Sequence, residues 1–183
     1  MVLPLTRQVV MGTTPVLSFE TSQIQRKRRM ALDLFYGAYQ AQLRQDFLLA
    51  IEKYRASIEV FPTAEAHTFL GWAYSLIGDL EGAISECHRA IDVDPDFGNP
   101  YNDIGAYLIA KGEYEQAVPY LERALNSKRY KAYHFAHFNL GRAREYQGDV
   151  LNALRHYKLA LAIEPHYIVA SKAIEHLKKC TLN

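Results

Sequence analysis

Residues 69–79 read FLGWAYSLIGD, and Ala83 and Pro95 follow them in one copy of a pattern that recurs along the chain. Gly71 and Ala83 are small, so the two helices that carry them can pack closely. Gly78 favours the left-handed backbone that closes a helix, and a proline ends the second helix of the pair. The stretch therefore predicts a helix-turn-helix unit.

The pattern is present in four copies. Gly71, Gly105 and Gly141 take the small position in three of them, and Ala38 takes it in the first. Gly71 and Gly105 are 34 residues apart, whereas Gly105 and Gly141 are 36 apart. The surplus falls near residues 127–133, where no proline closes the helix. It predicts an extended helix or a bulged turn at that place.

The turns between paired helices share a glycine followed by an acidic residue. They read Gly78-Asp79, Gly112-Glu113 and Gly148-Asp149. The acid lies at the start of the next helix, where negative charge is favourable, and an aspartate there can also cap the helix. The first copy has Gln45-Asp46 without the glycine, which predicts a less regular turn.

These residues resemble the tetratricopeptide repeat, a helix-turn-helix unit of about 34 residues, and the chain looks similar to uncharacterised bacterial proteins of that family. The resemblance implies an all-α fold, a right-handed α-solenoid built of tandem helix-turn-helix pairs. The four repeats would occupy residues 31–63, 64–97, 98–133 and 134–166. Residues 167–183 have apolar side chains at helical spacing and would form a C-terminal capping helix and tail.

The amino-terminal residues 1–20 do not match the repeat. Prolines and a glycine interrupt this stretch, which predicts an extended or disordered arm. The first helix would then begin at a cap on Thr21 or Ser22 and continue into the first repeat.

The composition favours a cytoplasmic chain without a membrane span. Apolar residues make up 49% of the sequence, enough for a continuous core, yet no apolar run approaches the roughly 20 residues that a membrane helix needs. The start lacks the basic cluster and apolar core of a secretory signal. Cys87 and Cys180 are far apart and suggest no disulfide framework.

The sequence contains no pattern that indicates catalysis, a cofactor or a metal. Phosphate-binding loops, Cys-x-x-Cys pairs and Gly-x-Ser-x-Gly elbows are absent from it. His134 and His137 could share a metal by their spacing. However, His67 and His137 occupy the same position in their repeats, which indicates a packing role. We therefore expect neither an enzyme nor a metalloprotein.

The resemblance implies a binding role, because the first helix of each tetratricopeptide pair lines a concave groove that usually holds a partner peptide. Carried over to this chain, the groove candidates are Phe35, Tyr39, Trp72, Asn99, Asn102, Phe138, Asn139 and Arg142, with Thr68, Ser75 and Phe135 on the same helix faces. The single tryptophan is either an anchor for a ligand or a packing residue between neighbouring helices.

The expected partner is a protein or a peptide. Some tetratricopeptide domains hold acidic chaperone tails with a clamp of lysines and asparagines, but Phe35 and Tyr39 occupy those positions of the first repeat here. Nucleic acid is not expected, because no basic stripe recurs in the repeats. The alternative is a self-assembly module, whose arm at residues 1–20 occupies its own or a neighbour's groove and supports a homo-oligomer.

Overall fold

The structure is a computed structural model that describes residues 15–181, and within them it consists of helices joined by short connections. The helices are α1 (Pro15–Leu43), α2 (Phe47–Val60), α3 (Ala64–Leu76), α4 (Leu80–Val93), α5 (Asn99–Lys111), α6 (Tyr114–Leu125), α7 (Tyr133–Tyr146), α8 (Val150–Ile163) and α9 (Ile168–Thr181). The all-α prediction is confirmed.

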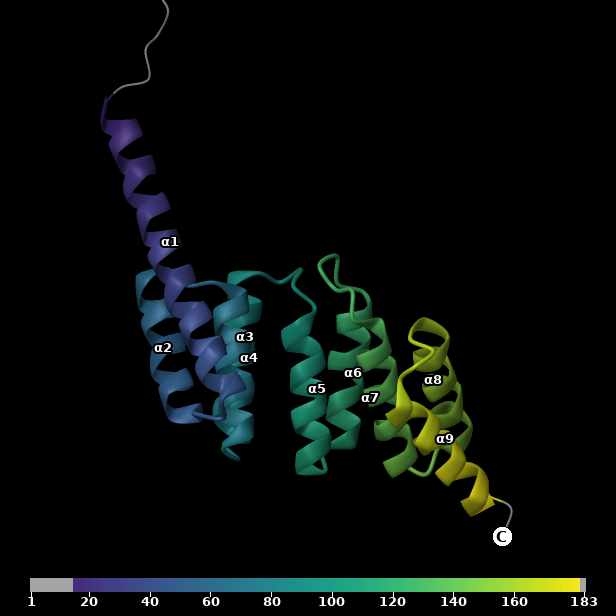
Figure 1. Ribbon diagram of the computed structural model, residues 1–183. Coiled ribbons are helices and arrows are strands. Elements are labelled where there is room, and N and C mark those ends of the chain that lie inside the picture. The colour runs from purple at the N-terminus through teal and green to yellow at the C-terminus, as the bar shows by residue number, and fades with distance from the viewer. Residues whose placement is uncertain (1–14, 182–183) are drawn as a thin grey trace, which may run out of the picture.

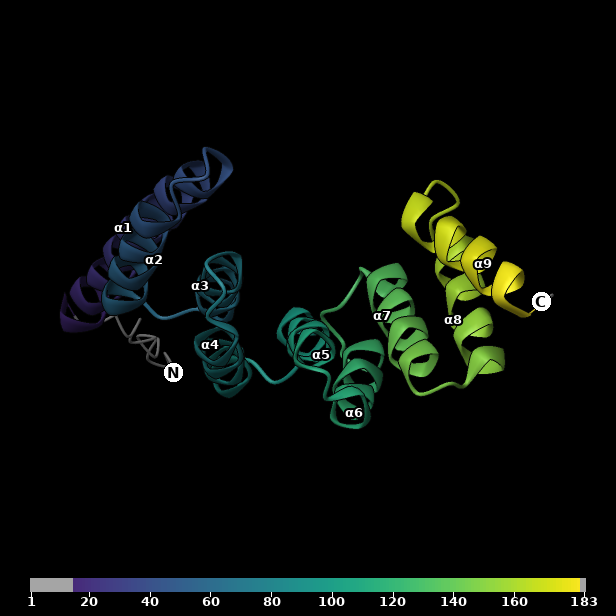
Figure 2. The ribbon, with the colours of Figure 1, turned by 90° about the horizontal axis from the view of Figure 1, so that it is seen from below.

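The helices form successive hairpins that stack into a right-handed α-solenoid. Each odd-numbered helix from α1 to α7 packs on the helix that follows it, and α2, α4, α6 and α8 each pack on the first helix of the next pair. The first helices also contact one another, α1 with α3, α3 with α5, and α5 with α7. Figure 2 shows α3, α5 and α7 along one side of the resulting arc, with α4 and α6 along the other. The first helices therefore line the inner surface.

Small residues set the distance between the two helices of a pair. A Cβ added at Gly71 would lie 2.9 Å from the carbonyl oxygen of Ala83, and one added at Gly105 would lie 2.5 Å from Cδ2 of Leu121. Both distances are too short for real contacts, so a side chain at Gly71 or Gly105 would push α3 from α4 or α5 from α6. The predicted role of these glycines in close helix packing is confirmed.

The tight turns use the left-handed backbone that the glycines predicted. Gly78, Gly112 and Gly148 have φ angles of 86°, 83° and 79°. Asp79 and Asp149 cap the following helices through hydrogen bonds to backbone N–H groups.

The first turn corrects the prediction of irregularity. Gln45 takes the left-handed conformation itself, with φ 63°, and the Asp46 carboxylate accepts a hydrogen bond from the backbone N–H of Leu49 at 3.2 Å. The packing of α1 on α2 therefore imposes the same turn without a glycine, at the cost of strain on a residue with a side chain.

The amino-terminal helix starts earlier than predicted. Residues 15–20, assigned to an extended arm, are the first turns of α1, so Thr21 and Ser22 lie inside the helix and do not cap it. Figure 1 shows this part of α1 extending beyond the end of α2. Pro15 does not interrupt the helix because proline is compatible with its first position. The rest of the predicted arm, residues 1–14, lies outside the described residues.

The surplus residues before the fourth repeat form a bulged connection, one of the two predicted possibilities. Residues 126–132 leave the end of α6 and run beside the loop that precedes α5. The backbone N–H of Arg129 donates to the carbonyl oxygen of Asp96 at 2.9 Å, and Gly98 donates back to Arg129 at 3.4 Å. These hydrogen bonds tie the connection to the end of the second repeat.

The last helix, α9, covers the end of the solenoid. Ala170, Ile174 and Leu177 are buried on its inner face, and the last two join a cluster that includes Tyr157 of α8. The cap is therefore confirmed. Among the described residues, no helix is both long enough and apolar enough to cross a membrane.

Candidate functional site

A cleft of about 510 Å³ opens on the inner surface, where α3, α5 and α7 meet. It is lined by Thr68, Phe69, Trp72 and Ser75 of α3, Asn99, Asn102, Asp103 and Tyr107 of α5, Tyr130 and Ala132 of the connection, and Phe135 of α7. Its wall thus combines aromatic rings with amide, hydroxyl and carboxyl groups. This mixture suits a ligand with both apolar and polar parts.

Trp72 contributes to the cleft without belonging to the core. Its side chain is 41% exposed, and its ring makes an edge contact with Phe69, with the centroids 5.8 Å apart. The residues on either side of it, Gly71 and Ala73, are buried against the neighbouring helices. The structure thus leaves the indole available to a ligand.

Four polar side chains form a hydrogen-bonded chain along the inner surface from α7 to α5. Arg142 donates to Oδ1 of Asn139 at 3.4 Å, and Nδ2 of Asn139 donates to Oδ1 of Asn102 at 3.1 Å. Nδ2 of Asn102 donates in turn to Oδ1 of Asp103 at 3.1 Å. We call these residues the polar chain. Its hydrogen bonds fix the orientation of both buried amides, and it has a cation at one end and a carboxyl group at the other.

The carboxyl end of the polar chain is poorly solvated. Burial raises the pKa of Asp103 to about 7, an increase that the hydrogen bond from Asn102 only partly offsets. The group in turn helps to raise the pKa of Cys87, Tyr107 and Tyr130, which lie around it. An ionised carboxylate is therefore costly at this place unless a positive charge approaches it.

The rim of the cleft is held by Arg129. Its guanidinium group pairs with Glu65 at 2.7 Å and with Asp94, and it lies over the ring of Phe97, 5.1 Å from the centroid. These contacts fasten the bulged connection to the start of α3, to the end of α4 and to the loop before α5, and Tyr130, the next residue of the connection, lines the cleft.

The structure brings together only part of the predicted groove set. Trp72, Asn99 and Asn102 line the same cleft, and Asn139 and Arg142 join it through the polar chain.

Phe35 and Tyr39 instead pack in a cluster on the amino-terminal side. Their ring centroids lie 5.1 Å and 5.8 Å from that of Phe69. Phe35 also lines a separate cleft of about 540 Å³ with Leu32, Tyr36 and other residues of α1 to α3. Phe69 reaches both clefts and joins the two regions.

Phe138 does not line the cleft. Its ring centroid lies 5.5 Å from that of Tyr157 and 5.3 Å from that of Tyr167, and it packs against the cluster under α9. Phe138 therefore contributes to the packing of the carboxyl-terminal helices.

Models of the tetratricopeptide repeat match residues 31–96, 99–130 and 134–167, which together cover most of the chain. The chain belongs to the tetratricopeptide repeat family.

One relative is the small glutamine-rich tetratricopeptide repeat-containing protein 2 of Mycosarcoma maydis. It is 34% identical over 79 residues, which cover 43% of this chain and 22% of that protein. This tetratricopeptide chain covers between 22% and 28% of the length of three such relatives, so the similarity concerns the repeats and not the whole proteins.

Two solved structures share the fold. PilW, a type IV pilus biogenesis factor, has a TM-score of 0.77 at 20% identity, covering 82% of this chain and 70% of that one. The first tetratricopeptide domain of Spaghetti (RPAP3), bound to an HSP90 peptide, has a TM-score of 0.60 at 19% identity. That match covers 66% of this chain and 94% of that one.

Sequence reasoning missed several residues that line the tetratricopeptide cleft. Asp103 lies four positions after Asn99 on α5, so helical spacing could have placed it on the same face. Phe69 was not predicted, because Trp72, which lies three positions further along α3, was the aromatic residue selected on that helix. Tyr130 gave no signal, because it lies in the connection that departs from the repeat.

His67, His137 and His156 pack inside the solenoid, and no metal cluster is found among the described residues. His67 pairs with buried Glu86, with Nδ1 and Oε2 2.7 Å apart. His137 and His156 approach each other through their Nδ1 atoms at 3.2 Å, and burial lowers the pKa of both. No group of three or more possible ligands gathers within residues 15–181.

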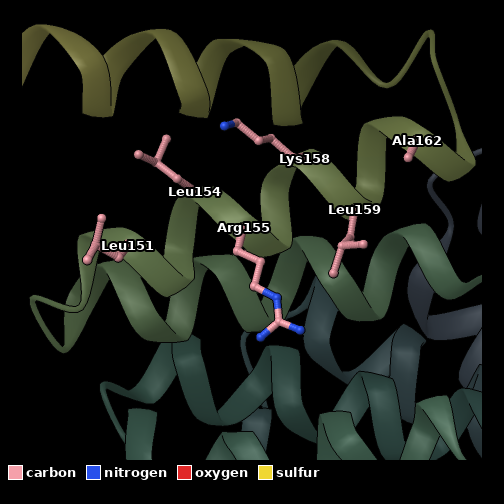
Figure 3. A pocket seen from close by; sticks show the side chains of 6 residues that line it. All are labelled: Leu151, Leu154, Arg155, Lys158, Leu159 and Ala162. Atoms are coloured by element: carbon pink, nitrogen blue, oxygen red, sulfur yellow. The ribbon is translucent and has the colours of Figure 1, made fainter.

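A third hollow lies on α8 and is less suited to a ligand. It measures about 490 Å³ and is lined by Leu151, Leu154, Arg155, Lys158, Leu159 and Ala162. Figure 3 shows Leu154 and Lys158 directed towards α9, while Arg155 and Leu159 point away from it. These side chains come from one helix and diverge, whereas the cleft on the inner surface collects side chains from three helices.

Proposed function

We propose that this tetratricopeptide chain is an interaction scaffold or adaptor that binds an extended segment of a partner protein in its concave groove. The observation that carries the proposal is the cleft between α3, α5 and α7, with an exposed indole on one wall and a hydrogen-bonded polar chain beside it. An exposed aromatic ring supplies affinity by leaving water, and fixed polar groups supply orientation.

The comparisons support a peptide as the ligand class. The tetratricopeptide domain of Spaghetti shares this fold and was solved with a peptide bound. Phe35 and Tyr39 occupy the first-repeat positions of a chaperone-tail clamp in this chain, so the proposal concerns a peptide in the groove and not that particular tail.

The two ends of the groove suit different parts of the peptide. Trp72 and Phe69 offer apolar surface for a side chain. Arg142, at the far end of the polar chain, offers donors to an acidic or amide-bearing stretch. The segment would run across both and cover Asn99 and Asn102 between them.

Substitution of the groove residues tests the proposal. Partners are captured with the wild-type protein and identified by mass spectrometry, and their affinity for Trp72→Ala and Arg142→Ala is then measured. Each variant should bind more weakly by about 1–3 kcal/mol, the range of interface hot spots and charged hydrogen bonds. Leu151→Ala, on the exposed face of α8, is the matched control. Normal affinity in both groove variants would place the binding site elsewhere.

Self-assembly through the amino-terminal end is a second candidate. Ile24, Leu32 and Tyr36 lie on one side of α1 and are each about half exposed, between 48% and 56%, and α1 extends beyond α2. Such a face suits a second copy. Light scattering on the full chain and on a chain lacking residues 1–14 tests whether the arm is involved. Equal monomeric masses would reject this candidate.

A peptide-binding role requires neither a reactive group nor a cofactor. We propose a cytoplasmic binding protein that acts without catalysis, without a cofactor and without binding nucleic acid or membrane. Its thiols support a reducing compartment, since Cys87 is buried and unpaired and Cys180 is exposed and unpaired.

A further inference from the structure

The cleft holds one acidic side chain that no charge of the described chain neutralises. Asp103 of α5 lines the cleft and accepts a hydrogen bond from its neighbour Asn102 at 3.1 Å. No lysine, arginine or histidine forms an ion pair with it within residues 15–181. The cleft therefore lacks a positive partner for its own carboxyl group.

The acids at the rim of the cleft differ from Asp103 in this respect. Glu65 and Asp94 share the guanidinium group of Arg129, and Lys128 pairs with Asp96 at 3.0 Å. Arg129 and Lys128 are thus engaged by other acids at the rim, and neither forms an ion pair with Asp103. A basic group of a ligand could supply the positive charge that the described residues do not pair with Asp103.

The surroundings of Asp103 make such a charge favourable. Desolvation raises its pKa to about 7, which means that ionisation in this place costs free energy. A cation beside the carboxylate would recover part of that cost. A neutral group could form a hydrogen bond with the carboxyl group but would not balance its charge, and an acidic group would repel the carboxylate.

Aromatic rings around the carboxyl group suit the same kind of ligand. Trp72, Tyr107, Tyr130 and Phe135 line the cleft together with Asp103. A cation gains from the face of such rings, and the aliphatic stem of lysine or arginine packs on them.

Elsewhere the same chain places guanidinium groups in this way. Arg28 lies 5.0 Å from the ring centroid of Phe61, and Arg123 lies 5.5 Å from that of Tyr101. A partner's basic side chain would repeat this arrangement in the cleft with a carboxylate added.

Resting on the proposed groove function, we propose that the cleft selects a lysine or arginine side chain of the partner segment. Asp103 is its counter-ion, and Trp72 is the aromatic surface against its stem. The polar chain supports this role, because the hydrogen bond from Asn102 fixes the orientation of the Asp103 carboxyl group. The groove would thus recognise a basic residue at α5, while Arg142 at the other end of the polar chain favours an acidic or amide group.

Selection from a displayed library of random heptapeptides tests the inference without a known partner. The library is panned against the wild-type protein, Asp103→Asn and Trp72→Ala. Asp92→Asn, which removes the same charge from an exposed position on α4, is the matched control. Wild-type and control pools should be enriched in lysine or arginine, and the Asp103→Asn pool should lose that enrichment.

The outcomes separate the inference from the function on which it rests. Neutral or acidic peptides that still require Trp72 would overturn the inference and leave the groove function standing. Peptides that bind Trp72→Ala as well as the wild type, or the absence of any enrichment, would overturn the groove function itself.

A titration then measures the contribution of the charge. A selected peptide is synthesised with arginine and with citrulline, its neutral isostere, and binding is followed by the fluorescence of Trp72, the only tryptophan of the chain. The citrulline form should bind the wild-type protein about tenfold more weakly or worse, in the range of charged hydrogen bonds. Both forms should bind Asp103→Asn alike. Equal affinities for the wild-type protein would refute the counter-ion.

Discussion

The two halves of the inner surface are built differently, although both derive from the same repeat. On α1 and α3, aromatic rings pack on one another, with Phe35, Tyr39 and Trp72 all in contact with Phe69. On α5 and α7, the corresponding surface carries the polar chain that runs from Arg142 to Asp103.

This difference shows that a repeat specifies the backbone but not the surface. The positions at which paired helices pack most closely, such as Gly71 and Ala83, are small because the two backbones approach there, whereas the inward-facing positions differ from one repeat to the next. The aromatic half offers apolar surface to a ligand, and the polar half offers hydrogen-bonding groups that would orient it. The cleft lies where the two halves meet, and Trp72 lines it together with Asn102 and Asp103.

The largest expected effect concerns the close packing of paired helices, which both halves share. Gly105→Leu should destabilise the protein by about 1–3 kcal/mol or more, because even a Cβ at this position would lie 2.5 Å from buried Leu121. Thermal unfolding measures the loss. Gly37→Ala is the control in the other half, since its Cβ would meet only Lys53 at an ordinary 3.5 Å. An unchanged melting temperature for Gly105→Leu would contradict the close packing of α5 on α6.

The next prediction separates packing from binding among the aromatic residues. Phe138→Ala should lower the free energy of unfolding by about 2–3 kcal/mol, somewhat less than for a fully buried phenylalanine, because its ring packs against Tyr157 and Tyr167. Trp72→Ala should lower it by less than Phe138→Ala does, since the indole is 41% exposed and so loses less buried surface in proportion to its size. Denaturant titration of both variants measures the two free energies of unfolding. If Trp72→Ala were the more damaging, the indole would belong to the core.

The smallest expected effect concerns pH. Asp103 has a folded-state pKa of about 7 against 3.8 for the free group, so the folded protein binds more protons between about pH 4 and 7, and stability falls as the pH rises through this window. Asp103→Asn should abolish this decline and raise the melting temperature at pH 7.5 by about 2–4 °C, with less gain at pH 5. Cys87, Tyr107 and Tyr130 around the carboxyl group stay neutral in this range.

His156 should act in the opposite direction in the other half. Its pKa falls from 6.5 to about 4, through burial and the proximity of His137. The unfolded chain therefore binds more protons between about pH 4 and 6.5, and stability rises with pH there. His156→Gln should weaken this rise in a series of melting curves. A variant whose pH dependence matched the wild type would show that the histidine pair does not contribute.

The repeat register predicted part of the cleft lining. Helical spacing placed Trp72, Asn99 and Asn102 on faces that do line one cleft, because the repeat determines which side of each first helix faces inward. The same spacing also selected Phe138, and here it was insufficient, since Tyr167 after α8 covers this ring. The register predicts which face of a helix a residue lies on, but it does not predict which other residues pack against that face.

By itself, the sequence determined the helix pairs, their turns and their close packing. These depend on local signals, such as Gly78 and Asp79, that repeat about every 34 residues and act within one unit. Only the tertiary structure decided the course of the connection with Arg129 and Tyr130 and the desolvation of Asp103. The physical reason is distance along the chain, because burial and electrostatic environment depend on segments from several repeats that no local pattern relates.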